Sequence, residues 1–169
     1  MRLAPVATTL AGLLCAATPS MAQQENCRQF SWSMGRQIDL FDEPLPVVEN
    51  ERSLPKEGVF AILLKPVAEV IYRVPPQRGR DSGFGGVVTI ESLPAGRYQI
   101  ALSEMAWVDA VQDDKRLAIL ATREWGCRGV RRSVDADVKG EPLTLQIGGA
   151  SVPRLSIAVV RIWPFEWRW

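Results

Sequence analysis

The sequence predicts an all-β protein, a two-layer antiparallel β-sandwich with a short N-terminal helix. From Val59 onward, short runs of Val, Ile and Leu alternate with Gly, Pro and Asp, which is typical of a sandwich or barrel. Two of these runs alternate apolar and polar residues, as strands with one dry and one wet face do. Pro94 and Gly96 form a turn directly before another such run.

The first 22 residues have the features of a secretory signal peptide. Arg2 supplies a positive charge, the stretch that follows it is apolar, and small residues permit cleavage after Ala22. A lipoprotein signal with Cys15 as the acylated residue is the alternative. The apolar stretch is too short to span a bilayer. We therefore expect no transmembrane segment, and a single domain over residues 23–169 located in the periplasm.

The N-terminal helix is predicted over Cys27 to Phe41. Phe30, Met34, Ile38 and Phe41 recur at spacings of four, four and three residues, which places them on one helix face.

Nine strands are predicted after this helix. They span residues 59–65, 69–74, 86–91, 97–103, 107–112, 116–121, 130–138, 143–147 and 155–162. In two strands the alternation separates the faces. The predicted inner residues are Val134, Ala136, Val138, Leu143, Leu145 and Ile147, and the predicted solvated residues are Ser133, Asp135, Asp137, Thr144 and Gln146.

The composition excludes several classes of site. The chain has 20 basic and 19 acidic residues, and this balance argues against nucleic acid or an anionic membrane as a partner. It contains no histidine, so a Ser-His-Asp triad, a three-His zinc site and a His-ligated haem are impossible. We expect no cofactor, no metal ion and no enzymatic activity.

Two cysteines, Cys27 and Cys127, remain after signal cleavage. An exported protein enters an oxidising compartment, so the simplest expectation is a Cys27–Cys127 disulfide. Two buried free thiols are the alternative.

Several motifs in the second half resemble a family of small exported bacterial proteins of unassigned role. The matching residues are Gly96, Tyr98, Ala101, Trp107, Asp109, Cys127, Gly129, Arg131, Arg132, Leu145, Gln146 and Gly149. Some members are named homogentisate dioxygenase, an activity that implies iron held by histidines, which this chain lacks. The turn and strand around Tyr98 are also similar to pre-peptidase C-terminal and transthyretin-like sandwiches, which implies a related fold.

Trp107 and Asp109 share one face of a predicted strand, opposite Ala106, Val108 and Ala110. If the small apolar residues are buried, the Trp and the Asp point outward, and with Arg131 they are the best candidates for a ligand surface. In the structural alternative, which we favour, Trp107 covers the sheet edge or lies under a loop, and Asp109 pairs with an arginine on the neighbouring strand, such as Arg131.

The C-terminus is rich in tryptophan. Trp163, Trp167 and Trp169 fall within the last seven residues, after a predicted final strand. Trp is a frequent anchor of protein interfaces, so this tail could bind a partner. The alternative is a tail that folds back over the end of the sandwich.

Acidic pairs at Asp113-Asp114 and Asp135/Asp137 could supply oxygen ligands to calcium, but a hairpin tip and a solvated strand face are ordinary places for acids. The leading functional hypothesis is a non-catalytic periplasmic binding or accessory module, with an envelope protein or glycan as its partner. A carboxylate-based hydrolase of an envelope glycan is the first alternative. A small structural subunit of an envelope complex is the second.

Overall fold

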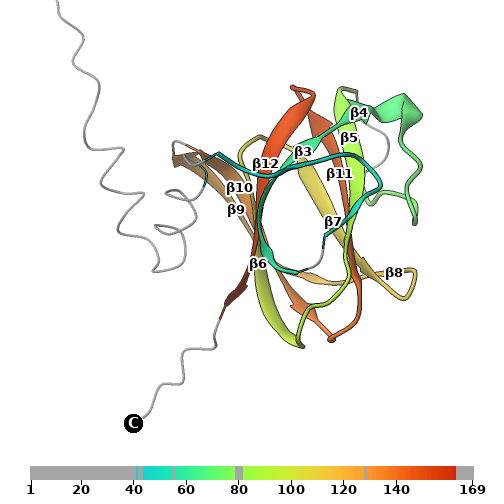
Figure 1. The fold of residues 1–169 in the computed structure, drawn as a ribbon, viewed down its shortest axis with the longest axis vertical. Helices are drawn as coiled ribbons and strands as arrows, with labels where there is room; N and C mark the ends of the chain where they lie inside the picture. The colour runs from blue at the N-terminus through green and yellow to red at the C-terminus, as the bar shows by residue number, and fades with distance from the viewer. Residues whose placement is uncertain (1–40, 42–43, 55, 79–81, 128, 163–169) are drawn as a thin grey trace, which may run out of the picture.

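Twelve strands form two packed sheets in the computed structural model, which describes residues 41, 44–54, 56–78, 82–127 and 129–162 (Figure 1). Sheet A contains, in spatial order, β1 (Val47–Val48), β3 (Gly58–Leu63), β12 (Arg154–Ile162), β6 (Gly96–Leu102), β10 (Val130–Val138) and β9 (Ile119–Cys127). Sheet B contains β2 (Ser53–Leu54), β5 (Phe84–Ile90), β11 (Leu143–Ala150), β7 (Trp107–Gln112) and β8 (Lys115–Arg116), and β4 (Lys65–Pro66) also pairs with β5. The predicted all-β sandwich is confirmed.

Both sheets are mixed, whereas the sequence predicted antiparallel sheets. The short strand β1 pairs in parallel with β3, and β2 pairs in parallel with β5. Strands β1 and β2 follow each other closely in the chain. The first adds to the edge of sheet A and the second to the edge of sheet B, on the same side of the molecule. Two-residue strands carry too little alternation to be recognised from sequence, which is why no strand was predicted before residue 59.

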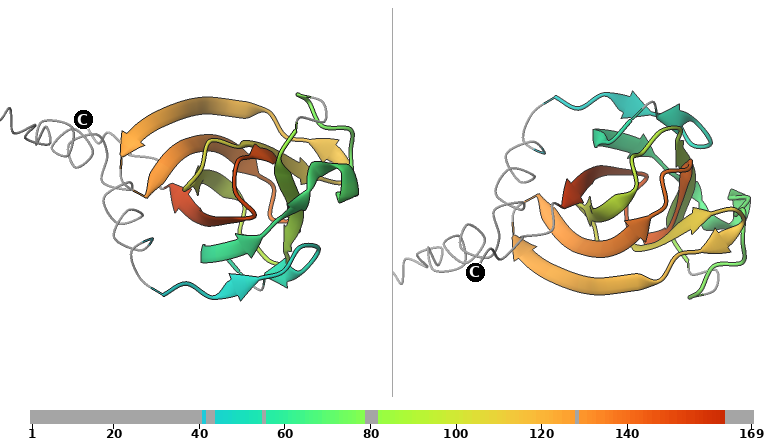
Figure 2. Two further views of the ribbon diagram at one scale, coloured as in Figure 1. Left: turned by 90° about the horizontal axis from the view of Figure 1, so that it is seen from above. Right: turned by 90° about the horizontal axis from the view of Figure 1, so that it is seen from below.

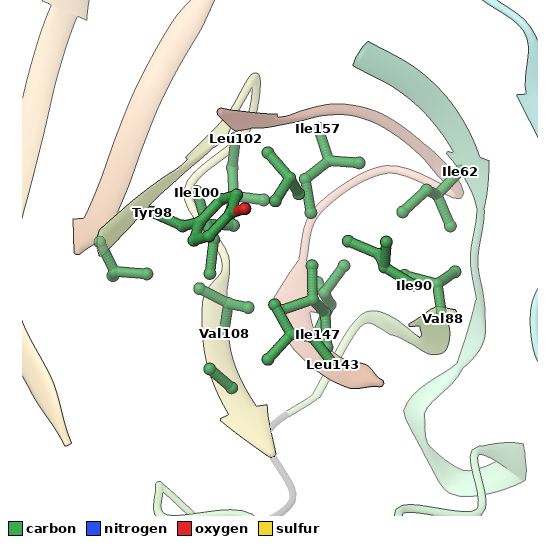
Figure 3. Packing of buried hydrophobic residues seen from close by; sticks show 14 of the residues in the cluster. Ile62, Val88, Ile90, Tyr98, Ile100, Leu102, Val108, Leu143, Ile147 and Ile157 are labelled. Carbon is green, nitrogen blue, oxygen red and sulfur yellow. The ribbon is translucent and has the colours of Figure 1, made fainter. Parts of the chain in front are cut away.

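The core lies between the two sheets. Inner residues of β6 and β12 in sheet A face inner residues of β5, β7 and β11 in sheet B (Figure 3). The predicted inner residues Val134, Ala136, Val138, Leu143, Leu145 and Ile147 all belong to this core. Each fully buried Leu or Ile side chain contributes roughly 1.5–3 kcal/mol to folding, so this alternation contributes a large part of the driving force.

Two predicted strands differ in the structure. The strand predicted over 69–74 is absent, and the chain forms a one-turn 3-10 helix, η1 (Val67–Glu69), followed by an irregular segment, residues 70–78, that we call the strap. Pro75 and Pro76 lack the N–H groups that a strand ladder requires. The strand predicted over 116–121 is divided, because β8 ends at Arg116 and β9 continues to Cys127.

Several predicted features lie outside the described residues. They are the signal peptide, the helix over 27–41 apart from Phe41, the Cys27 end of the disulfide, and the three C-terminal tryptophans. Phe41 packs with partly buried neighbours against Ala101, Val130 and Ala158 on the outer side of sheet A. Within the described part of the chain, no helix is long and apolar enough to cross a membrane.

Candidate functional site

The outer face of sheet B carries the two residues that the sequence nominated first. Ala106, Val108 and Ala110 lie in the core, so the predicted alternation of β7 is confirmed. Trp107 and Asp109 point to the other side of the sheet, yet each is only 6% exposed. This face is therefore covered, and the strap covers it (Figure 1).

Trp107 lies beneath the strap and is packed against Tyr72. The two ring centroids are 5.4 Å apart, with the ring planes inclined at 45°. The indole also lies over Gly148 on β11, where a Cβ atom would come within 2.3 Å of Trp107 Cζ2. The backbone of β11 can approach the ring this closely only because residue 148 has no side chain. Within the described ranges, the buried indole Nε1 has no hydrogen-bond partner.

Asp109 is tied to the strap rather than to an arginine. Its Oδ2 accepts a hydrogen bond of 3.0 Å from the backbone N–H of Gln77. Arg131 is exposed on β10, a strand of the other sheet, and no ion pair joins it to Asp109 among the described residues. The expected Asp109–Arg131 pair is therefore wrong, whereas the placement of Trp107 under a loop is confirmed. The proposed surface of Trp107, Asp109 and Arg131 is not brought together.

Two buried glutamines also bond crossing backbone to sheet B, Gln146 a second point of the strap and Gln112 the segment 139–141. Gln146 accepts a hydrogen bond from Val74 N at 2.9 Å and donates one to Val74 O at 3.1 Å. Gln112 accepts from Lys139 N at 3.0 Å and donates to Glu141 O at 2.9 Å. Each side-chain amide thus accepts one hydrogen bond from a backbone N–H and donates one to a backbone C=O, as the backbone of a neighbouring strand would. The prediction that Gln146 and Thr144 face solvent is wrong, because both are buried.

The outer face of sheet A is also less solvated than its sequence predicts. Ser133 and Asp135 are buried. The Asp135 carboxylate accepts hydrogen bonds from Gln99 Nε2 at 3.3 Å and Arg123 Nη1 at 3.0 Å, which join three strands. Asp137 is exposed as predicted, and its bidentate bonds to the Arg97 guanidinium lower its pKa.

The acidic pairs have structural partners in the described part of the chain. Asp114 forms an ion pair of 2.7 Å with Arg73 of the strap. The neighbouring Asp113 carboxyl group raises the pKa of Glu141. Across the described residues, no group of three or more Cys, Asp or Glu side chains could hold a metal ion.

One residue that the sequence interpretation passed over has an unusual environment. Arg132 on β10 lies opposite Leu102 of β6, which is a core residue, and opposite Glu124 of β9. Directly paired residues share a sheet face, so Arg132 points to the inner side. It is only 8% exposed, and its buried Nε has no hydrogen-bond partner among the residues that the structure describes. Arg132 has the same parity as Val134 and Val138, so an arginine on an apolar face was visible in the sequence.

The inner face of sheet A is uncovered near Arg132. Thr122 lies opposite the core residue Val134, and Glu124 lies opposite Arg132, yet both side chains are exposed. β9 is the outermost strand on this side of sheet A (Figure 2). We call the inner-face region of Thr122, Glu124 and Arg132 the open flank, because the core-facing side of β9 and β10 here extends beyond the cover of sheet B.

A second arginine acts on the open flank. Burial is the largest cause of the lowered pKa of Arg132. The positive charge of Arg78 lowers this pKa further, and the negative charge of Glu124 raises it. Arg78 is the last residue of the strap and directly follows Gln77, which is bonded to β7. β7 in turn contacts β10. The bonded strap therefore carries a cationic side chain whose charge acts on the buried Arg132.

Comparisons with protein-family models, with curated proteins and with solved structures each gave no match.

Proposed function

We propose that this protein is a non-catalytic binding or accessory module of the periplasm, and that it holds its partner at the open flank. The observation that carries the proposal is the exposure of Thr122 and Glu124 on a sheet face whose next residues form the core. Inner strand faces are normally covered by the opposing sheet. A face left open beside a buried cation is a surface that a partner can complete.

The polar residues of sheet B support a scaffold role for the opposite face. Asp109, Gln112 and Gln146 each bond to the backbone of a crossing segment. Their hydrogen-bonding groups therefore hold the strap and the 139–141 turn in place. This use favours a binding module over a carboxylate-based hydrolase, in which such groups would act on a substrate.

The experiment is capture of partners from an envelope extract of the native host by the tagged mature protein. Thr122→Trp should fill the open flank, and the matched control Lys65→Trp adds the same side chain at an exposed position on β4, at the other side of sheet B. A protein or glycan retained by the wild type and by Lys65→Trp, but lost by Thr122→Trp, is the expected result. Equal capture by both variants would contradict binding at the flank.

Export and the disulfide are tested together. The signal segment and Cys27 predict that periplasmic protein carries a Cys27–Cys127 bond. Intact mass after alkylation without reductant should show no added label and an N-terminus at Gln23. The bond would close the long loop between Cys27 and Cys127 and so stabilise the fold by roughly 4–5 kcal/mol at most. Reduction should therefore lower the midpoint of thermal unfolding. Two alkylated thiols in periplasmic protein would contradict the pairing.

A further inference from the structure

We propose that Arg132 and Arg78 bind an oxyanion, a phosphate or carboxylate group, at the open flank. The inference rests on the proposed binding function and specifies the chemistry of the ligand. Arg132 carries it, because the residue is more than nine-tenths buried, its Nε is buried without a hydrogen-bond partner, and no ion pair engages it within the described residues.

An unpartnered buried cation is unusual because removing a charge from water is costly unless the charge is paired. The opposing charge that acts on Arg132 is Glu124 on the adjacent strand, which is exposed and forms no ion pair with Arg132 among the described residues. The Arg132 guanidinium is thus held in position by its burial while its capacity to donate hydrogen bonds remains unused.

Arg78 adds a second positive charge near the first. The fold keeps it there, since Gln77 N–H is bonded to Asp109, Val74 is bonded to Gln146, and Arg73 pairs with Asp114. The positive charge of Arg78 disfavours the charged form of Arg132, and an anion bound between the two side chains would offset that repulsion. Guanidinium groups present planar pairs of N–H donors that match the oxygens of carboxylates and phosphates.

The geometry also leaves a way in. Thr122 and Glu124 are exposed beside Arg132, so a ligand can approach along the inner face of β9. The Glu124 carboxylate would repel a multiply charged anion, so the ligand should place only one oxyanion group against Arg132. The remainder of the ligand would lie along the open flank toward Thr122.

The test measures binding of inorganic phosphate and of acetate to the full mature chain, by calorimetry and by thermal unfolding. Ionic strength is held constant with sodium chloride. Wild-type protein should show a saturable rise in unfolding temperature with at least one probe. A stronger response to phosphate identifies a phosphoryl ligand, and a stronger response to acetate identifies a carboxylate.

Three variants locate the site. Arg132→Gln and Arg78→Gln should each weaken binding at least about tenfold, the loss expected when one charge-assisted hydrogen bond worth about 1.4 kcal/mol is removed. Arg131→Gln, an exposed neighbour on the same strand, should bind as the wild type does. Arg78 is exposed, so its variant keeps the test valid if Arg132→Gln fails to fold.

The outcomes separate this inference from the proposed function. Absence of a saturable response in wild-type protein, or an unchanged response in both Arg132→Gln and Arg78→Gln, overturns the oxyanion site. If partner capture is still lost in Thr122→Trp, the flank binds a partner of other chemistry and the proposed function stands. If the oxyanion binds at the two arginines but Thr122→Trp captures the same partners as the wild type, the oxyanion site stands and the binding of an envelope partner at the open flank is contradicted.

Discussion

Asp109 lies on the side of β7 that faces away from the core, yet the strap buries it. Its energetic role follows from its partner, which is a backbone N–H rather than a cation. A carboxylate and an amide both offer an oxygen to that donor. The residue therefore stabilises the fold through an acceptor atom more than through its charge.

Asp109→Asn should cost little stability, whereas Asp109→Ala should lower the free energy of unfolding by about 1–3 kcal/mol, the cost of an unsatisfied buried donor. Chemical denaturation of both variants measures the difference. Arg131→Gln is the control and should lie within about 0.5 kcal/mol of wild type, as exposed substitutions usually do. Equal losses for the Asn and Ala variants would show that the charge itself has a partner.

Gly148 is required by the indole above it. In Gly148→Ala the new Cβ would meet Trp107 Cζ2 at 2.3 Å and Tyr72 Oη at 2.8 Å, so the variant should lose about 1–3 kcal/mol through overpacking. The same substitution in a Trp107→Val background should cost less, because the nearest ring atoms are gone. A thermal-unfolding double-mutant cycle tests this, and additive losses would contradict the contact.

At the scale of elements, the strap and the 139–141 turn are held to sheet B by matching devices. One buried glutamine serves each segment, and each side-chain amide bonds both the N–H and the C=O of the crossing backbone. The two segments should therefore depend on different residues although they cross the same sheet.

Gln146→Leu should loosen the strap around Val74, and Gln112→Leu should loosen the 139–141 turn. Amide hydrogen exchange read by mass spectrometry should show faster exchange over residues 70–78 in the first variant and over 139–141 in the second, because local opening controls exchange in such segments. Each variant is the control for the other. Faster exchange throughout β11 in both variants would mean that the glutamines support the sheet rather than the crossing segments.

At the scale of the whole molecule, the net charge is close to neutral and the sequence holds 19 acidic residues, so acid sensitivity depends on individual carboxylates. Arg97 lowers the pKa of Asp137. A depressed folded-state pKa contributes stability above the unfolded value, near 4, and that contribution is lost as the pH falls through the folded value. Asp113 raises the pKa of Glu141, so the ionised Glu141 destabilises the fold above this pH, opposite to Asp137.

Asp137→Asn should therefore lower the unfolding temperature at about pH 7, and this difference from wild type should shrink as the pH falls below about 4. Glu141→Gln should be neutral or stabilising at about pH 7, because it removes repulsion from Asp113 that is absent in acid. Unfolding temperatures measured across this pH range give both profiles. A constant offset for Asp137→Asn at every pH would contradict the role assigned to its charge.

The sequence by itself determined the fold class, most strands and the two faces of β7, β10 and β11. Burial of Val134, Ala136, Leu145 and their neighbours followed from alternation alone, because a two-residue period assigns each side chain to one face. The export signal, the Cys27–Cys127 bond and the C-terminal tail remain predictions.

Only the tertiary structure decided which residues on the outer faces of the two sheets are exposed to solvent. Alternation places Asp109, Gln146 and Asp135 away from the core, but it cannot show that the strap covers the first two or that Gln99 and Arg123 engage the third. The same limit applied to Arg132, whose parity is visible in the sequence although its neighbours are not. The charge that acts on it comes from Arg78, more than 50 residues away in the sequence, and a local period carries no information about such distant neighbours.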